Sequence, residues 1–226
     1  MEAFSDLFTF VSGVPGLAIL ALAALTLFLT ADWRLSLTAL LVEYIAVGLV
    51  LTRFLQAEVA LAKILAGAFV VFMLYLAARR VQEAQPLLLS EPPSRRFLGL
   101  QISWGGGPLG LPLRLLTVLL VALGLVRLFG GYQFPLIPID VAFVTCWLGS
   151  LGLMGLVLSG EPLRVAPALL TILAAFDLVY ASLEPNLAVA GFFAALTLLA
   201  ALAFSYLITV HGLAEVELPA EEETEL

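Results

Sequence analysis

The chain has 226 residues, of which 62% are hydrophobic and only 12% are charged, and its formal net charge is −7. A soluble globular domain is about half apolar and about a quarter charged, so this excess of apolar residues cannot be hidden in one soluble core. The composition therefore predicts an integral membrane protein in a lipid bilayer. Lys and Arg form no cluster of the kind that binds nucleic acid, and the single cysteine, Cys146, excludes an intrachain disulfide.

Seven apolar runs are long enough, at about 20 residues each, to cross the hydrocarbon core as helices. Polar or turn-forming residues separate them, and the absence of alternation argues against the strands of a membrane barrel. We therefore predict an all-α, polytopic membrane helix bundle of about seven transmembrane helices. The runs are 8–30, 35–53, 58–78, 112–129, 138–159, 163–183 and 187–210.

Residues 1–78 are expected to form a first unit of three helices. The N-terminus has neither a positive region nor a convincing cleavage site, so we expect its first helix to insert as mature protein. Glu43 lies roughly 13–15 Å from either end of the second helix, close to the midplane, at about 1.5 Å per residue. Lys63 lies about 8 Å below the surface at which the third helix begins.

Residues 79–111 form the one long connection. Its segment "SRRFLGLQISW" (94–104) mixes Arg with large apolar side chains, which fits a segment lying along the headgroups as well as an irregular surface loop. The following "WGGGPLG" comes after no predicted strand and lacks a phosphate-loop Lys, so a nucleotide site is not expected there. A single linking helix is predicted at 112–129.

A second unit of three helices is expected over residues 138–212, followed by an acidic, solvated tail at 213–226. Asp140 opens the first of these helices after "PLIP", where a helix-start role is favoured over proton transfer. Asp177 lies in the second, about 10 Å below the surface near Glu184. The chain has one His and no CxxC motif, so no ligand set for a metal or haem is visible, and we expect no cofactor.

The basic residues divide unequally between the two sides of this arrangement. One side carries Arg34, Arg79, Arg80, Arg95, Arg96, Arg114 and Arg164, whereas the other carries only Arg53 and Arg127. The positive-inside rule then places the N-terminus outside and the acidic C-terminus in the cytoplasm.

Glu43, Lys63 and Asp177 are ionisable groups at depths where water is scarce, and an unpaired charge at the centre of the bilayer costs at least about 2.5–3.5 kcal/mol. Lys63 could pair with either carboxylate and simply hold helices together. Alternatively, Lys63 could snorkel outward while a neutral Asp177 bonds to Thr171 or Tyr180. The functional alternative is a proton path, because acids and bases placed in hydrocarbon can take up and release protons in turn.

The stretch 33–78 is similar to the small three-helix K subunit of respiratory complex I. A basic residue opens a helix, a Glu follows at mid-depth, and the next helix carries another ionisable group and ends in "AARR". In that family the group on the third helix is Glu, whereas here it is Lys63, so Glu43 is the position that matches best.

The whole chain, as two three-helix units joined by one helix, resembles the E subunit of hydrogenase-4, which shares the Lys of the third span, the carboxylate of the sixth and a last helix ending near "TVHG". The resemblance implies a membrane-arm subunit that is not catalytic by itself and belongs to an ion-translocating oxidoreductase complex. It also implies neighbours that include antiporter-like subunits, a proton path through Glu43, Lys63 and Asp177, and the inner (plasma) membrane of a prokaryote.

Two other functions stay open from sequence. One is a structural or assembly subunit of another photosynthetic or respiratory membrane complex, with charges that only pair helices. The other is a small stand-alone transporter, although no span is broken by a central Pro-Gly pair and no small-molecule substrate is evident. An intramembrane enzyme is disfavoured because no Ser/His, Asp/Asp or metal set is visible in the spans.

Overall fold

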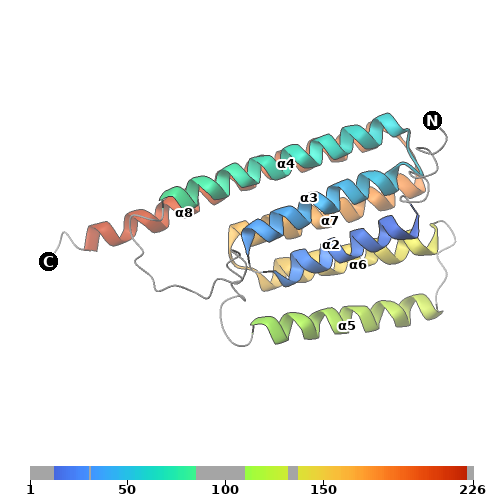
Figure 1. Cartoon of the computed structure of the whole chain (residues 1–226), viewed down its shortest axis with the longest axis horizontal. Helices are drawn as coiled ribbons and strands as arrows, with labels where there is room; N and C mark the ends of the chain where they lie inside the picture. The colour runs from blue at the N-terminus through green and yellow to red at the C-terminus, as the bar shows by residue number, and fades with distance from the viewer. Residues whose placement is uncertain (1–12, 31, 85–109, 132–136, 223–226) are drawn as a thin grey trace.

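The computed structural model describes residues 13–30, 32–84, 110–131 and 137–222, and these residues are almost entirely helical. The described part contains no strand, which confirms the predicted all-α fold class. Within it, seven helices follow one another along the chain (Figure 1). They are α2 (Val14–Leu29), α3 (Trp33–Leu51), α4 (Ala57–Ala84), α5 (Gly110–Gly131), α6 (Ile139–Leu158), α7 (Pro162–Leu183) and α8 (Leu187–Glu222).

Six of these helices, α3 to α8, are long and apolar enough to cross a membrane. The helix α2 is equally apolar but has 16 described residues, and the beginning of its predicted run, 8–12, lies outside the described residues. Helices are what a membrane permits, because they satisfy the backbone polar groups within each segment. The chain is thus a polytopic membrane helix bundle.

Two helices continue well past their predicted ends. The helix α4 extends six residues beyond 78, and α8 extends through Glu222 into the stretch expected to be a solvated tail. The predicted ends lie where hydropathy falls, but Ala, Glu, Leu and Gln favour helix irrespective of hydropathy. The predicted headgroup segment 94–104 and the last four residues of the chain lie outside the described residues.

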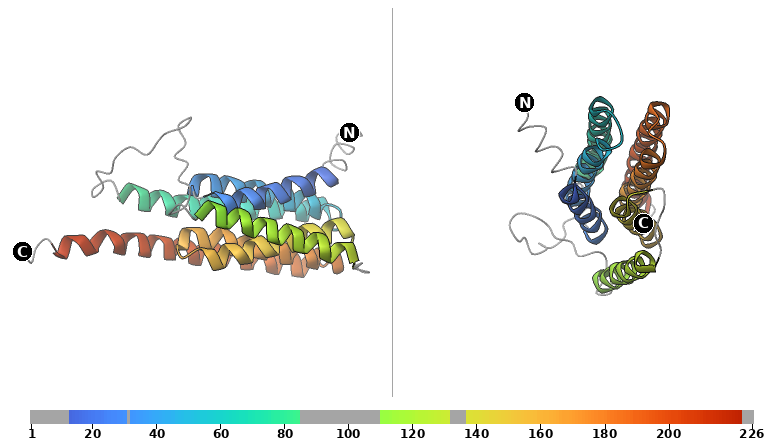
Figure 2. Two further views of the ribbon diagram at one scale, coloured as in Figure 1. Left: turned by 90° about the horizontal axis from the view of Figure 1, so that it is seen from below. Right: turned by 90° about the vertical axis from the view of Figure 1, so that its right-hand side faces the viewer.

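The helices are arranged as two rows of three that face each other. In one row α3 lies between α2 and α4, and in the other α7 lies between α6 and α8. Across the rows α2 contacts α6, α3 contacts α7, and α4 contacts α8, while α5 lies outside, beside α6 and α2 (Figure 2). The division of the chain into two three-helix units and a linking helix stays a prediction.

Close packing between helices depends on glycines. A Cβ on Gly67 of α4 would lie 2.5 Å from Cβ and Cγ of Tyr44 on α3, and one on Gly152 of α6 would lie 2.7 Å from Cγ1 of Ile172 on α7. Small residues let helix backbones approach in membranes, where lipid is as apolar as the side chains and packing drives association. The two central helices, α3 and α7, are consequently the most buried.

The two ends of the bundle differ in charge. We call the end with Arg34, Arg79, Arg80, Arg114 and Arg164 the basic end, and the end with Arg53 and Arg127 the opposite end. Because neighbouring helices along the chain run in opposite directions, all described arginines fall on the predicted sides. Which end faces the cytoplasm stays a prediction from the positive-inside rule.

Candidate functional site

Glu43 lies at the centre of the bundle, and its residue exposure is 0%. It stands ten residues into α3, about 15 Å from the start of the helix, and faces α7. The hydroxyl of Thr171 on α7 donates a hydrogen bond to Oε2 of Glu43 over 3.0 Å. The second carboxyl oxygen, Oε1, is buried and has no hydrogen-bond partner among the described residues. Glu43 therefore has a neutral partner and, in the described part of the chain, no counter-charge.

Tyr44, the next residue of α3, adds a second unsatisfied group nearby. Its ring packs against the bare backbone at Gly67, and its buried hydroxyl has no hydrogen-bond partner in the described part of the chain. Buried polar groups are bonded in the great majority of cases, and exceptions are often functional. The region around Glu43 is thus short of hydrogen-bond partners.

Lys63 and Asp177 form a buried ion pair that joins α4 to α7. The distance between Nζ of Lys63 and Oδ2 of Asp177 is 2.7 Å, and the exposed fractions of the two side chains are 9% and 6%. The ammonium also lies 5.9 Å from the centre of the Phe193 ring on α8, within range of a cation–π contact. Charge compensation at short range offsets part of the cost of burying both groups at this depth.

These contacts decide between the pairings that sequence left open. Lys63 pairs with Asp177 and not with Glu43, and it does not snorkel to the surface. The alternative of a neutral Asp177 bonded to Thr171 or Tyr180 is wrong: Thr171 bonds to Glu43, and the Tyr180 ring packs against Phe193. The three predicted groups thus separate into a pair and a single acid.

Asp140 lies at the start of α6, in the helix-start position predicted for it. It lies inside the first turn of α6, whose N-cap position is occupied by Pro138 without any side-chain cap. Its carboxylate forms an ion pair at 3.0 Å with Arg53, which lies just after the end of α3. The helix begins at Ile139 with Pro138 as its N-cap, so Asp140 complements the helix dipole as an acid of the first turn and does not cap the helix with its side chain. The two side chains are 39% and 26% exposed, so this pair is at the surface.

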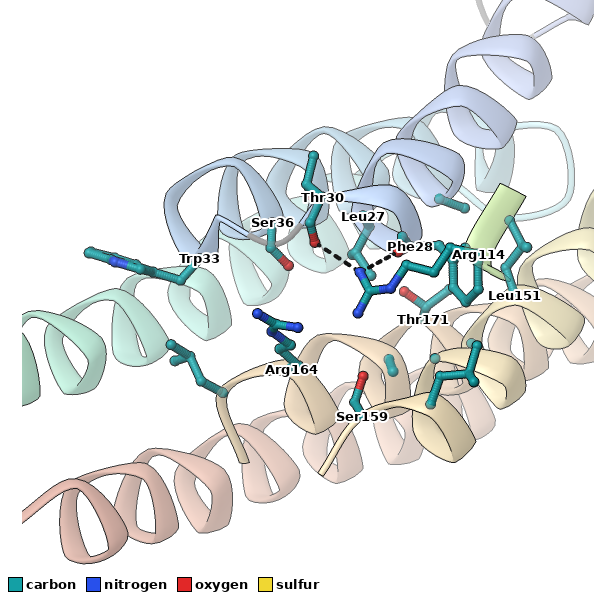
Figure 3. A pocket seen from close by; sticks show the side chains of 16 residues that line it. Leu27, Phe28, Thr30, Trp33, Ser36, Arg114, Leu151, Ser159, Arg164 and Thr171 are labelled. Carbon is teal, nitrogen blue, oxygen red and sulfur yellow. Dashed lines mark hydrogen bonds between the residues drawn. The ribbon is translucent and has the colours of Figure 1, made fainter. Parts of the chain in front are cut away.

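A pocket opens at the basic end, and the residues that line it reach as deep as Thr171. Its volume is about 30 Å³, and Figure 3 shows Arg114, Arg164 and Thr171 all turned towards it. Two guanidinium groups and four hydroxyl groups supply its polar lining. They belong to Arg114, Arg164, Thr30, Ser36, Ser159 and Thr171.

Arg114 fixes one wall of this pocket and ties the outlying α5 to the bundle. One of its terminal nitrogens donates to the backbone oxygens of Phe28 at 3.0 Å and Thr30 at 3.5 Å. The last carbonyls of a helix have no partner within the helix, and the negative end of the dipole attracts a cation. Arg114 satisfies these carbonyls at the end of α2.

Sequence reasoning does not identify Arg114 and Thr171 as residues of this site. Arg114 is predicted there only as a flanking charge, and Thr171 only as a partner of Asp177. A Thr in the middle of the apolar run "LLTIL" is a usable signal, since hydroxyls in membrane helices often bond to a neighbouring helix. The position of Arg114 depends on how α5 folds back on α2, which no local pattern indicates.

The described residues hold no group of three or more His, Cys, Asp or Glu side chains that could bind a metal ion. His211 instead lines a second pocket of about 440 Å³ at the basic end, together with Trp33 and Gln82. Comparison with family models, with curated proteins and with solved structures gives no match to this chain.

Proposed function

We propose that the chain is a non-catalytic membrane subunit of a complex-I-like respiratory or hydrogenase complex, in which Glu43, Lys63 and Asp177 contribute to proton translocation. The observation that carries the proposal is the environment of Glu43. This carboxyl group is fully buried at mid-depth, its described partner is a neutral hydroxyl, and one oxygen has no described partner.

A purely structural acid is expected to be satisfied, as Asp177 is by Lys63. Glu43 can gain or lose a proton without breaking an ion pair, because it belongs to none in the described residues. Its neutral form avoids burying a charge. Ionisable groups inside a membrane bundle commonly mark proton routes.

The proposed partners are other membrane-arm subunits, including antiporter-like ones, and the surrounding lipid. The apolar outer faces of α4, α5 and α8 are exposed in the isolated chain and suit either contact. We place the chain in the inner (plasma) membrane of a prokaryote, with the N-terminus outside and the C-terminus in the cytoplasm. The redox reaction belongs to other subunits.

The Lys63–Asp177 pair favours a second candidate, a structural or assembly subunit. A short, buried ion pair between α4 and α7 holds two helices in register and needs no proton transfer to explain it. This candidate explains two of the three buried groups but leaves the isolated Glu43 without a reason.

The test compares Glu43→Gln with Glu58→Gln, the same change at an exposed position on α4. The chain is purified in mild detergent, its copurifying proteins are identified, and redox-linked proton uptake is measured in vesicles. We expect antiporter-like partners with both variants, and reduced uptake with Glu43→Gln alone. Normal uptake combined with a poor yield of the complex would instead support the structural candidate.

A further inference from the structure

We infer that the pocket at the basic end holds water and connects Glu43 to that side of the membrane through the hydroxyl of Thr171. The inference deepens the proposed function, on which it rests for the role of Glu43, by naming the route through which Glu43 exchanges protons. It starts from one residue shared by two features: Thr171 lines the pocket and also donates to the Glu43 carboxyl group.

The depth of the pocket makes this route possible. Thr30, Trp33 and Ser159 lie at or beside the helix ends of the basic end, and they form its outer part. Thr171 lies nine residues into α7, about 14 Å below that end, where helix rise places the middle of the hydrocarbon core. The residues that line the pocket therefore extend from the basic end to the depth of Glu43.

The size and lining of the pocket select water as its occupant. A volume of about 30 Å³ accommodates one or two water molecules and no organic substrate. Water needs two to four polar partners, and the hydroxyls of Ser36, Ser159 and Thr171 together with two guanidinium groups supply them. A metal cation such as sodium is disfavoured, because arginines in a narrow pore act as an electrostatic barrier to cations.

The proton step requires only groups at this site and water. A water molecule of the pocket gives a proton to Oγ1 of Thr171, and the original hydroxyl proton of Thr171 passes to Oε2 of an ionised Glu43. A hydroxide ion, an unchanged threonine and a neutral carboxyl group result. The two guanidinium groups of the pocket attract the hydroxide ion, which leaves to the basic end, and the reverse sequence returns the proton. The hydrogen bond from Thr171 to Glu43 already has the direction that the inward transfer needs.

The positions of the charged groups around Glu43 favour a proton route that leads to the basic end. Arg114 of α5 and Arg164 of α7 lie between Glu43 and the basic end, whereas Asp177 lies about 9 Å beyond Thr171 towards the opposite end. Lys63 of α4 faces Asp177, and α2 carries no titratable side chain. Of the remaining neighbours, Tyr44 lies beside Glu43 on α3, and Asp140 and Cys146 of α6 do not line the pocket.

Hydroxyl-radical footprinting of the full chain in lipid vesicles tests whether the pocket is wet, because radicals formed from bound water oxidise the side chains that touch it. Leu151 and Leu148 form a matched pair one turn apart on α6: both are at most 2% exposed, but only Leu151 lines the pocket. We expect oxidation of Leu151 and of the pocket residue Phe28, and none of Leu148. Equal protection of Leu151 and Leu148 would overturn the inference.

A second measurement tests the hydroxyl relay. The exchange of the Glu43 carboxyl proton for deuterium is followed by infrared spectroscopy after transfer to D₂O, in Thr171→Val and in Thr145→Val. Thr145 is a buried hydroxyl on α6 that does not line the pocket. We expect several-fold slower exchange in Thr171→Val only, and equal rates in both variants would exclude the relay. Failure of the proposed function looks different: Glu43→Gln would then leave proton uptake intact while the pocket is still wet.

Discussion

The two buried carboxyl groups of this protein solve the same physical problem in different ways. Asp177 meets Lys63 at 2.7 Å and shares its charge with a partner, whereas Glu43 meets only the hydroxyl of Thr171 among the described residues. The pair is held by electrostatics and is costly to disturb, while the single acid can change its charge without leaving a buried cation behind. Two buried acids therefore differ in the charge of their partners, and this difference is the basis for proposing different roles for them.

The largest loss of stability is expected from breaking the pair on one side. Lys63→Met leaves the Asp177 carboxylate without its counter-charge in the bundle, and removing one partner of a buried pair costs about 3–5 kcal/mol. Thermal unfolding of the purified chain in detergent measures this loss. Met preserves the length and apolar stem of Lys63, so the change isolates the charge.

The matched control is Arg79→Met, which breaks a pair with the same 2.7 Å distance between Arg79 and Glu83 at an exposed position. Exposed pairs contribute little, so no measurable shift in unfolding is expected there. A further control, Lys63→Met combined with Asp177→Leu, removes both charges and is expected to regain most of the stability. Equal shifts for the two single variants would show that burial does not strengthen the Lys63–Asp177 pair.

A smaller loss is expected from disturbing the packing beside the single acid. In Gly67→Ala the new methyl group would lie 2.5 Å from the Tyr44 side chain, which forces α3 and α4 apart next to Glu43. Overpacking of this kind costs about 1–3 kcal/mol, measurable by thermal unfolding. Gly191→Ala on α8 is the matched control, since nothing lies within 4 Å of its added Cβ. If both variants unfold alike, the close approach of α3 and α4 is not required.

Neutralising the single acid is expected to change stability least among the central residues. Glu43→Gln keeps an oxygen that accepts from Thr171 and replaces the other oxygen by an NH₂ group of similar size that does not titrate, so the free energy of unfolding should change by less than about 1 kcal/mol. The same thermal unfolding assay measures this change. A loss as large as that of Lys63→Met would mean that Glu43 carries a charge on which the fold depends, and the contrast between the two acids would disappear.

The smallest effect is expected at the surface pair of the opposite end. Asp140→Asn removes the charge that meets Arg53, and because both side chains are partly exposed the cost should be under about 1 kcal/mol. It should also vanish at high salt, which screens exposed charges. A loss that is independent of salt would show that this pair lies in a drier environment than its exposure indicates.

Sequence predicts the helices and the depths of the buried charges well, because both depend on local features. Hydropathy marks each span, and the rise per residue places Glu43 at mid-depth without knowledge of the neighbours. Sequence also predicts that Lys63 has a carboxylate partner, because an isolated ammonium group is costly at that depth. The ion pair with Asp177 confirms this prediction.

The choice of partner could not be predicted. Glu43 and Asp177 lie at depths that both allow contact with Lys63, and only the three-dimensional packing of α4 relative to α3 and α7 decides which carboxylate it meets. Likewise, the pocket forms where the ends of α2 and α6 and the starts of α3, α5 and α7 converge. Such convergence depends on the packing of helices far apart in the sequence, which local patterns do not encode.

The contrast between the two acids is tested most directly by infrared spectroscopy of the carboxyl C=O stretch while pH is varied, on the full chain in lipid vesicles. We expect a carboxyl band that responds to pH, disappears in Glu43→Gln and is unchanged in Glu58→Gln, while the carboxylate signal of Asp177 stays constant over the same range. A band that persists in Glu43→Gln would contradict the assignment of Glu43 as the group that changes its charge.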